Sequence, residues 1–276
     1  AKPSEVVFTS GGTESNNFAI TGLTYSNYPS KNHIITTKID HDCVINTCKY
    51  LEKHMAKVTY LDVDGEGFVN PKDVETAITD KTFLVSIIHG NNEIGTIQNL
   101  EEIGKICKKK GVLFHSDACQ SFTKVPIDVK KMNIDLLTLN GHKIHGPKGI
   151  GALYIREGVN LELLIHGANH EMGKRAGTEN VAGIVGLGKA SQIARENMNE
   201  YNKRISYLRD LLYKKLESIA KVRLNGHLKE RLPNTLNLSF EGVDSSNLLS
   251  KLKNIALSTG SACHDNIKKP SAVLIA

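Results

Sequence analysis

Tryptophan is absent from this chain of 276 residues, and aromatic residues make up only 5% of it. The basic residues are scattered along the chain with few aromatics among them, so the net charge of +6 argues little for a nucleic-acid partner. That charge suits a phosphorylated or acidic ligand better. No run of 18 apolar residues occurs, and we therefore expect no membrane partner and no membrane span.

Cysteine is also scarce, with five residues that show no paired spacing. An odd number without such spacing does not suit a disulfide framework and favours a reducing, cytoplasmic setting. The chain opens directly before a predicted strand and closes on an apolar segment without a stop signal. We therefore expect it to be cut at both ends, and an organelle stays open because a targeting peptide would lie upstream.

One group of residues raises the question of a zinc site: His41, Cys43, Cys48 and His54. The group contains no Cys-x-x-Cys pair, and Cys48 is predicted to pack on the apolar face of a helix from about residue 43 to residue 57. We therefore predict no metal.

Short apolar segments alternate with amphipathic ones along the first part of the chain. Strands are predicted at residues 5–9, 33–39, 58–63, 83–88, 112–116, about 134–139, and 151–155. Helices are predicted to begin at Glu14, at about Cys43, after an Asn70 cap, and at Leu100, the last ending at Gly111. This alternation is typical of an α/β fold with a mostly parallel sheet between helices, and 40% hydrophobic residues can supply its core.

Helical periodicity continues from Val181 to Ile219, with a polar break near residues 196–202. We place a domain boundary there. Residues 1–197 are predicted to form a large domain, and residues 198–276 the start of a smaller α+β C-terminal domain. The smaller part contains a strand at 235–240, a short helix near 248–252, and a loop of small residues that presents Cys263.

Lys143 follows the apolar run that ends at Asn140 and Gly141. Partial desolvation by Leu139 and Ile144 would disfavour its ammonium form and leave an amine able to form a Schiff base. A solvated lysine on a loop is the alternative, and for a single lysine it is the more common situation.

The segment from Ser10 to Thr13 joins a predicted strand to a predicted helix. Gly12 and its neighbouring glycine let a ligand approach the backbone, Thr13 adds a hydroxyl, and a helix N-terminus favours an anion. These features suit a phosphate, although the order of residues is not that of a P-loop. A capped turn without a ligand is the alternative.

Polar residues follow several predicted strands. A predicted strand closely precedes His41, the Asn91–Gly95 segment and Asp117. The carboxyl ends of parallel strands form the edge of an open sheet at which ligands bind. An imidazole can stack on an aromatic cofactor, and a carboxylate can pair with a cationic ring nitrogen. Ordinary capping of the next helix or turn is the alternative for both side chains. The polar, glycine-rich segment from His166 to Asn180 is predicted to be an exposed loop that faces a ligand or partner.

Seven motifs, taken together and in this order, resemble those of the cysteine desulfurases. They are Ser10–Asn17 (SGGTESNN), Asp40–His41, Asn91–Gly95 (NNEIG), Asp117–Gln120 (DACQ), Gly141–Lys143 (GHK), Arg175–Thr178 (RAGT) and Ser261–Cys263 (SAC). The resemblance runs in register from about Val6 to Ala276. It implies a fold type I enzyme that depends on pyridoxal phosphate.

The resemblance also implies a set of cofactor ligands. They are Lys143 as the Schiff-base lysine, Gly12, Thr13 and His142 at the phosphate, His41 stacked on the ring, Asp117 on the pyridinium nitrogen, Gln120 facing the ring hydroxyl, and Asn92 holding the substrate or the ring oxygen. Thr178 would reach the phosphate of the neighbouring subunit in a homodimer. Asn140 stands where the family usually places a phosphate-binding serine, and its amide could substitute.

The implied activity is removal of sulfur from L-cysteine, with Cys263 as the sulfur acceptor and Lys143 and His41 as the groups that move protons. The sulfur would pass to an acceptor or scaffold protein for iron–sulfur cluster or thio-cofactor assembly. A selenocysteine lyase would share nearly every motif. A plain aminotransferase would keep Lys143 and Asp117 but need no thiol at 263, and a non-catalytic assembly partner or phosphate-binding module would not bind the cofactor.

Overall fold

The computed structural model describes residues 1–258 and 271–276. Cys263 lies outside the described residues.

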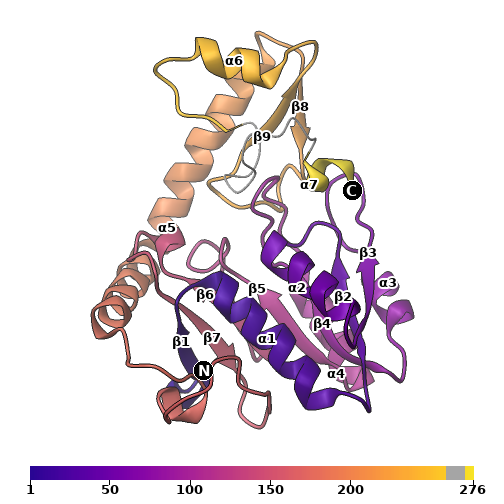
Figure 1. Cartoon of the computed structure of the whole chain (residues 1–276). Helices are drawn as coiled ribbons and strands as arrows, with labels where there is room; N and C mark the ends of the chain where they lie inside the picture. Colours follow the sequence, from indigo (N-terminus) through magenta and orange to yellow (C-terminus); the bar gives the residue numbers. More distant parts are fainter. Residues whose placement is uncertain (259–270) are drawn as a thin grey trace.

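A sheet of seven strands forms the centre of the larger part of the molecule (Figure 1). The strands are β1 (Val6–Thr9), β2 (His33–Thr37), β3 (Lys57–Leu61), β4 (Thr82–Ser86), β5 (Leu113–Asp117), β6 (Leu136–Asn140) and β7 (Gly151–Ile155). Their order is β1-β7-β6-β5-β4-β2-β3, and β7 runs antiparallel to both of its neighbours while the other pairs are parallel. The predicted fold class, a mostly parallel sheet between helices, is confirmed.

Two apolar cores lie on opposite faces of this sheet because successive strand residues point to opposite sides. On β2, Ile34 packs in one core and Ile35 in the other. The first core contains the buried faces of α1 (Gly12–Asn27) and α2 (Asp42–Glu52). The second contains those of α3 (Pro71–Ala77) and α4 (Leu100–Lys110), so helices cover both faces of the sheet (Figure 1).

The helix ends agree with their capping residues. Asn70 accepts a hydrogen bond from the Lys72 backbone nitrogen at the start of α3. Gly111 closes α4 with φ of 67°, a left-handed conformation that glycine adopts without steric cost. The predicted bounds of α4 are confirmed, whereas the helix predicted to run to about residue 57 ends at Glu52.

A smaller part lies above the large sheet in Figure 1. It contains the antiparallel pair β8 (Val222–Asn225) and β9 (Asn237–Phe240), with α6 (Ser245–Lys251) and α7 (Ala272–Ile275). The segment between β8 and β9 is joined to the loop after β4, since the Leu232 nitrogen donates to the Gly95 oxygen at 2.8 Å and the Arg231 guanidinium to the Ile94 oxygen at 2.8 Å.

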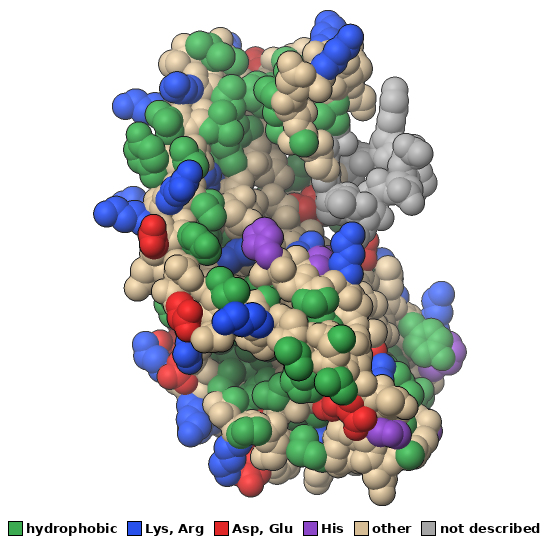
Figure 2. Space-filling view, turned by 90° about the vertical axis from the view of Figure 1, so that its left-hand side faces the viewer, with side chains coloured by type: hydrophobic (Ala, Val, Ile, Leu, Met, Phe, Trp, Pro, Cys, Tyr) green, Lys and Arg blue, Asp and Glu red, His purple; other side chains and the backbone are tan. Residues whose placement is uncertain are grey.

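The long helix α5 (Val181–Glu217) connects the two parts. It continues through residues 196–202, where we predicted a polar break, so the predicted domain boundary falls inside a helix and stays a prediction. Its apolar stripe contains Ile205, Leu208 and Leu212, each more than a third exposed. Figure 2 views the side on which α5 lies in Figure 1 and shows hydrophobic side chains there among lysines and arginines.

Candidate active site

The carboxyl ends of the parallel strands meet at one edge of the sheet, and the predicted site residues follow these ends. His41 comes after β2, Asn92 after β4, Asp117 closes β5, and Lys143 follows β6. In parallel sheets this edge is where ligands bind. The topology therefore brings together residues that lie far apart in the chain, from His41 to Lys143.

The phosphate residues predicted from the sequence line one concavity of about 350 Å³. Gly12 and Thr13 reach it from the start of α1, and Asn140 and His142 from the end of β6 and the turn that follows. Lys148 also lines it, and the sequence analysis did not identify this residue. We call this concavity the anion cup.

The start of α1 is shaped for a close approach by a ligand. Gly11 is the N-cap residue, and no side chain caps the helix there. A Cβ added to Gly12 would lie 2.5 Å from the Cys119 sulfur and 3.3 Å from the Asn140 amide nitrogen, so only glycine fits. Uncapped backbone N–H groups, a helix N-terminus and Lys148 together fit an anion such as the phosphate of pyridoxal phosphate.

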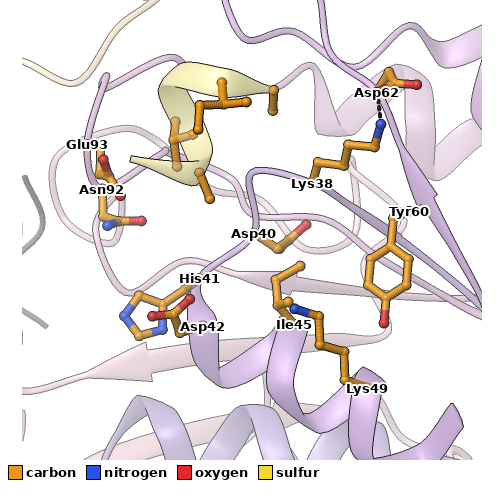
Figure 3. A pocket seen from close by; sticks show the side chains of 14 residues that line it. Lys38, Asp40, His41, Asp42, Ile45, Lys49, Tyr60, Asp62, Asn92 and Glu93 are labelled. Carbon is orange, nitrogen blue, oxygen red and sulfur yellow. Dashed lines mark hydrogen bonds and ion pairs between the residues drawn. The ribbon is translucent and has the colours of Figure 1, made fainter. Parts of the chain in front are cut away.

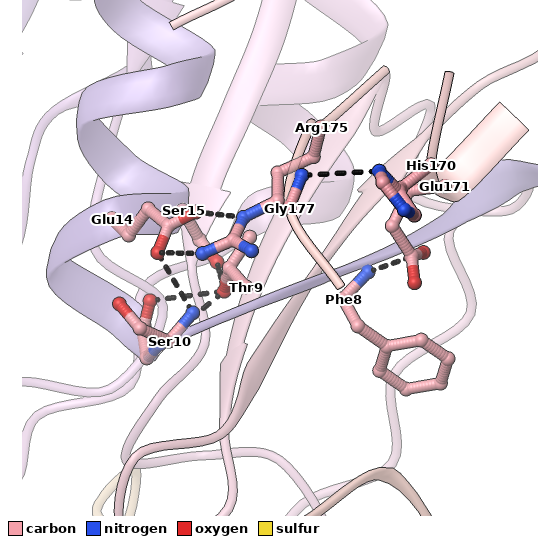
Figure 4. Close-up of polar contacts among 10 residues, drawn as sticks. Phe8, Thr9, Ser10, Glu14, Ser15, His170, Glu171, Arg175 and Gly177 are labelled. Carbon is pink, nitrogen blue, oxygen red and sulfur yellow. Dashed lines mark hydrogen bonds and ion pairs between the residues drawn. The ribbon is translucent and has the colours of Figure 1, made fainter. Parts of the chain in front are cut away.

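A carboxylate, Glu14, also stands in the first turn of α1, where it would repel an anion. Its oxygens accept hydrogen bonds from the Arg175 guanidinium at 2.9 and 3.3 Å and from the Ser10 nitrogen at 2.8 Å (Figure 4). Burial alone would raise the pKa of Glu14, but the hydrogen bonds from Arg175 and Ser10 outweigh it and lower that pKa. Arg175 thus neutralises Glu14 beside the anion cup.

The loop that carries Arg175 is fastened to β1 as well. Glu171 accepts a hydrogen bond from the Phe8 nitrogen at 3.0 Å, and His170 accepts one from the Gly177 nitrogen at 3.2 Å (Figure 4). Because β1 is an edge strand, its outward N–H groups need such partners. The Glu171–Phe8 and Arg175–Glu14 contacts hold the predicted exposed loop close to β1 and the start of α1, and the His170–Gly177 bond lies within the loop.

Asp117 is buried, with 4% of its surface exposed. One of its oxygens accepts from the Asn16 amide at 2.7 Å and the other from the Cys119 nitrogen at 2.8 Å. Two donors stabilise a carboxylate that burial alone would penalise. A charged carboxylate fixed in this way can pair with a cationic ring nitrogen.

His41 is the N-cap of α2, and its Nδ1 accepts from the Cys43 backbone nitrogen at 3.2 Å. The capping role that we kept as an alternative is therefore present. His41 also lines a cavity of about 670 Å³, to which Asn92 and Glu93 contribute from the loop after β4 and Ala276 from the end of α7 (Figure 3). A capping imidazole and a ligand-facing imidazole are compatible here.

Lys143 is exposed, and the predicted desolvation by Leu139 and Ile144 is wrong for this chain. The reason is the short 3₁₀ turn at His142–Ile144, designated η2, which buries Ile144 in a local core and leaves the two preceding side chains outside. Lys143 nevertheless lies within electrostatic reach of Cys119 and Lys124.

Lys124 was not identified from the sequence. Its Nζ donates to the Gln120 amide oxygen at 3.2 Å. Burial, followed by the charge of Lys143, lowers the pKa of Lys124 to about 8. Gln120, Lys124 and Lys143 thus form one group beside Cys119.

Thr178 and the residues considered for a zinc site remain to be located. Thr178 is exposed on its loop and does not line the anion cup. Among the residues described, no group of three or more His, Cys, Asp or Glu side chains could hold a metal ion, and no helix is long and apolar enough to cross a membrane. Cys48, one of the zinc candidates, packs in the first apolar core.

Comparison with known proteins identifies the class to which this fold and site belong. Residues 1–275 match the family described as aminotransferase class-V. Cysteine desulfurase IscS of Clostridium botulinum is 53% identical over 280 residues, which cover 100% of this chain and 70% of that protein. Cysteine desulfurase IscS of Methanosarcina thermophila is 51% identical over 278 residues, covering 100% and 69%.

Solved structures show the same family similarity. A NifS-like protein superposes with a TM-score of 0.88 at 42% identity, covering 91% of this chain and 69% of that one. A structure described as SspA in complex with cysteine has a TM-score of 0.87 at 41% identity, covering 100% and 77%. The chain belongs to the class-V aminotransferase family, whose enzymes use pyridoxal phosphate, and its predicted resemblance to the cysteine desulfurases is confirmed.

Proposed function

We propose that this protein removes sulfur from L-cysteine, using pyridoxal phosphate held at the carboxyl edge of the large sheet. The observation that carries the proposal is the pairing of two features at that edge: an anion cup at the start of α1 and the buried carboxylate of Asp117. The first suits a phosphate and the second a pyridinium nitrogen. The NifS-like and IscS relatives support the same activity.

Different residues of this chain would bind the phosphate of the cofactor and form its covalent link to the protein. Gly12, Thr13, Asn140 and His142, with Lys148, would hold the phosphate, and the exposed Lys143 would hold the cofactor covalently. Desolvation, followed by the charges of Lys143 and Lys148, lowers the pKa of His142. This shift favours the neutral imidazole, which can donate one N–H to an anion.

His41 would stack on the cofactor's ring, Asp117 would pair with its nitrogen, Gln120 would face its hydroxyl, and Asn92 would help to hold the substrate or the ring oxygen. When bound, pyridoxal phosphate withdraws electrons from the substrate's α-carbon. Lys143 and His41 would be the groups that move protons in this scheme.

The thiol of Cys263 is the proposed sulfur acceptor. Overall, L-cysteine and the Cys263 thiol give L-alanine and a Cys263 persulfide, so the sulfur moves without an external oxidant. Burial raises the pKa of each of the other four thiols, those of Cys43, Cys48, Cys107 and Cys119. Raised pKa values suppress the thiolate that attack on sulfur requires, which leaves Cys263 as the candidate.

The persulfide sulfur would pass to an acceptor or scaffold protein in a cytoplasmic setting. The enzyme would act as a homodimer in which Thr178 reaches the phosphate held by the neighbouring subunit. The exposed position of Thr178, on a loop that Arg175 and Glu171 fasten beside the anion cup, supports this arrangement.

Replacing Cys263 with Ser tests the proposal. The variant should keep the absorbance of the bound cofactor but lose persulfide formation and nearly all L-alanine production from L-cysteine. Cys107→Ala, which removes a thiol from the core beneath α4, is the matched control and should retain activity. Sulfide or alanine production near the unsubstituted rate in Cys263→Ser would overturn the assignment.

A further inference from the structure

Four side chains from α1, α2 and β5 form a continuous series of hydrogen bonds beside the proposed cofactor site. The Asn16 amide nitrogen donates to Asp117 Oδ2 at 2.7 Å and to Cys43 Sγ at 3.1 Å. Cys43 Sγ in turn lies 3.0 Å from His41 Nδ1. Asp117 and His41, which have separate implied roles at the cofactor, are thus linked through Asn16 and Cys43.

The direction of each bond follows from its partners. The Cys43 backbone N–H can only donate, and it points to His41 Nδ1 at 3.2 Å, so Nδ1 carries a lone pair. A neutral imidazole with an acceptor at Nδ1 carries its proton on Nε2. The Cys43 thiol must then donate to the same Nδ1, which leaves its sulfur to accept from Asn16.

The other end of the series is fixed by charge. Turning the Asn16 amide over would place its oxygen against the Asp117 carboxylate, so the nitrogen faces Asp117. Asn16 is fully buried, and its oxygen has no hydrogen-bond partner within residues 1–258 and 271–276. Burial, and to a smaller extent the charge of Asp117, raises the pKa of Cys43 to about 12, which keeps the thiol protonated and able to donate.

We propose that Cys43 is a positioning residue that, together with Asn16, ties His41 to Asp117 and holds the imidazole with its proton on Nε2. Two donors converge on Nδ1, so the nitrogen left for a bound ligand is Nε2, which carries the proton. His41 therefore offers a hydrogen-bond donor and a ring face to whatever binds against it.

The inference rests on the proposed function only for what His41 does to a bound cofactor. The tautomer is a property of the chain and can be measured with or without pyridoxal phosphate. Long-range ¹H–¹⁵N correlation spectra of the protein labelled in its histidines show which ring nitrogen carries the proton. The His41 signals are assigned by their loss in His41→Gln, since the chain has 11 histidines.

At a pH where the imidazole is neutral, we expect protonated Nε2 and unprotonated Nδ1 for His41. Cys43→Ala should move the Nδ1 resonance of His41 towards that of a nitrogen that accepts from fewer donors. Cys43→Ser keeps an O–H donor, so its Nδ1 resonance should stay close to that of the unsubstituted protein. Cys48→Ala, a buried thiol on the same helix, is the control and should leave the resonance unchanged.

A proton on Nδ1 in the unsubstituted protein would overturn the proposal. So would a Cys43→Ala variant whose His41 Nδ1 resonance equals that of the unsubstituted protein. The first criterion needs only the His41→Gln assignment and no Cys43 variant, so it holds even if Cys43→Ala fails to fold. A protein that shows the expected tautomer but neither binds pyridoxal phosphate nor consumes L-cysteine would instead count against the proposed function alone.

Discussion

Asp40, the residue before His41, is a buried carboxylate with an unusual balance of contacts. One oxygen accepts from the Thr36 hydroxyl at 3.1 Å and from the Thr37 nitrogen and hydroxyl at 3.1 and 2.6 Å. The other oxygen is buried without a hydrogen-bond partner in the described part of the chain. Burial, with a contribution from nearby Asp117, raises the pKa of Asp40 to about 7 against the opposing hydrogen bonds.

This raised pKa predicts a pH-dependent stability. Between about 3.9, the pKa of an unfolded aspartate, and about 7, the folded protein holds a proton on Asp40 that the unfolded chain has lost, so this group makes the protein less stable as pH rises through that window. In Asp40→Asn the group does not titrate. Thermal unfolding of the two proteins across the window should show the unsubstituted protein gaining stability relative to the variant as pH falls. Parallel curves would contradict the assignment.

Single residues also show the limits of prediction from sequence. His41 and Asp117 could be proposed as site residues because His41 follows a strand and Asp117 ends one at the ligand-binding edge. Asn16 and Cys43 could not, because their contacts join three segments far apart in the chain, and only the packing of α1 against α2 brings them together. Lys143 was proposed as a site residue, but its surroundings were predicted wrongly because sequence neighbours do not reveal which side of a 3₁₀ turn is buried.

At the scale of elements, the start of α1 determines the shape of the anion cup. Gly12→Ala would place a methyl group 2.5 Å from the Cys119 sulfur, inside van der Waals contact. We expect a loss of about 1–3 kcal/mol in the free energy of unfolding, and weaker binding of pyridoxal phosphate, because the helix start must shift. Chemical denaturation and cofactor titration measure the two effects.

The matched control is Gly188→Ala within α5, where an added Cβ meets nothing within 4 Å. That change should stabilise the protein by about 0.5–1 kcal/mol, as expected for alanine in an exposed helix. Equal effects of the two substitutions on cofactor affinity would show that the close approach at Gly12 is not important for the cup.

The elements whose ends are marked by capping or helix-ending residues were predicted well from the sequence. Gly111 and the Asn70–Pro71 pair determine helix ends by local chemistry, and α4 and β7 have the predicted bounds. The strand β8 was not predicted, since its four residues are stabilised by pairing with β9 and not by their own pattern. The polar break at 196–202 lies on a helix whose residues are mostly solvent-exposed, so polarity there does not end it.

At the scale of the whole molecule, the proposed homodimer explains why the loop that carries Thr178 is fastened through Arg175 and Glu171 while Thr178 itself is exposed. Sedimentation of the cofactor-loaded protein should show a dimer. Thr178→Val should stay dimeric but bind pyridoxal phosphate more weakly, whereas Thr76→Val, at an exposed position on α3, should bind it normally. A monomer that holds the cofactor as tightly as its relatives would contradict the shared site.

The central claim is that Lys143 at the carboxyl edge carries pyridoxal phosphate for the removal of sulfur from L-cysteine. Borohydride reduction of the loaded protein, followed by peptide mapping, tests it most directly, with Lys148→Ala as the control for the other lysine near the cup. We predict that the reduced cofactor is found on Lys143, that Lys148→Ala is labelled at the same residue, and that Lys143→Ala is not labelled there. A label on Lys124, Lys148 or any other lysine, or no label on a protein that turns over L-cysteine, would contradict the account.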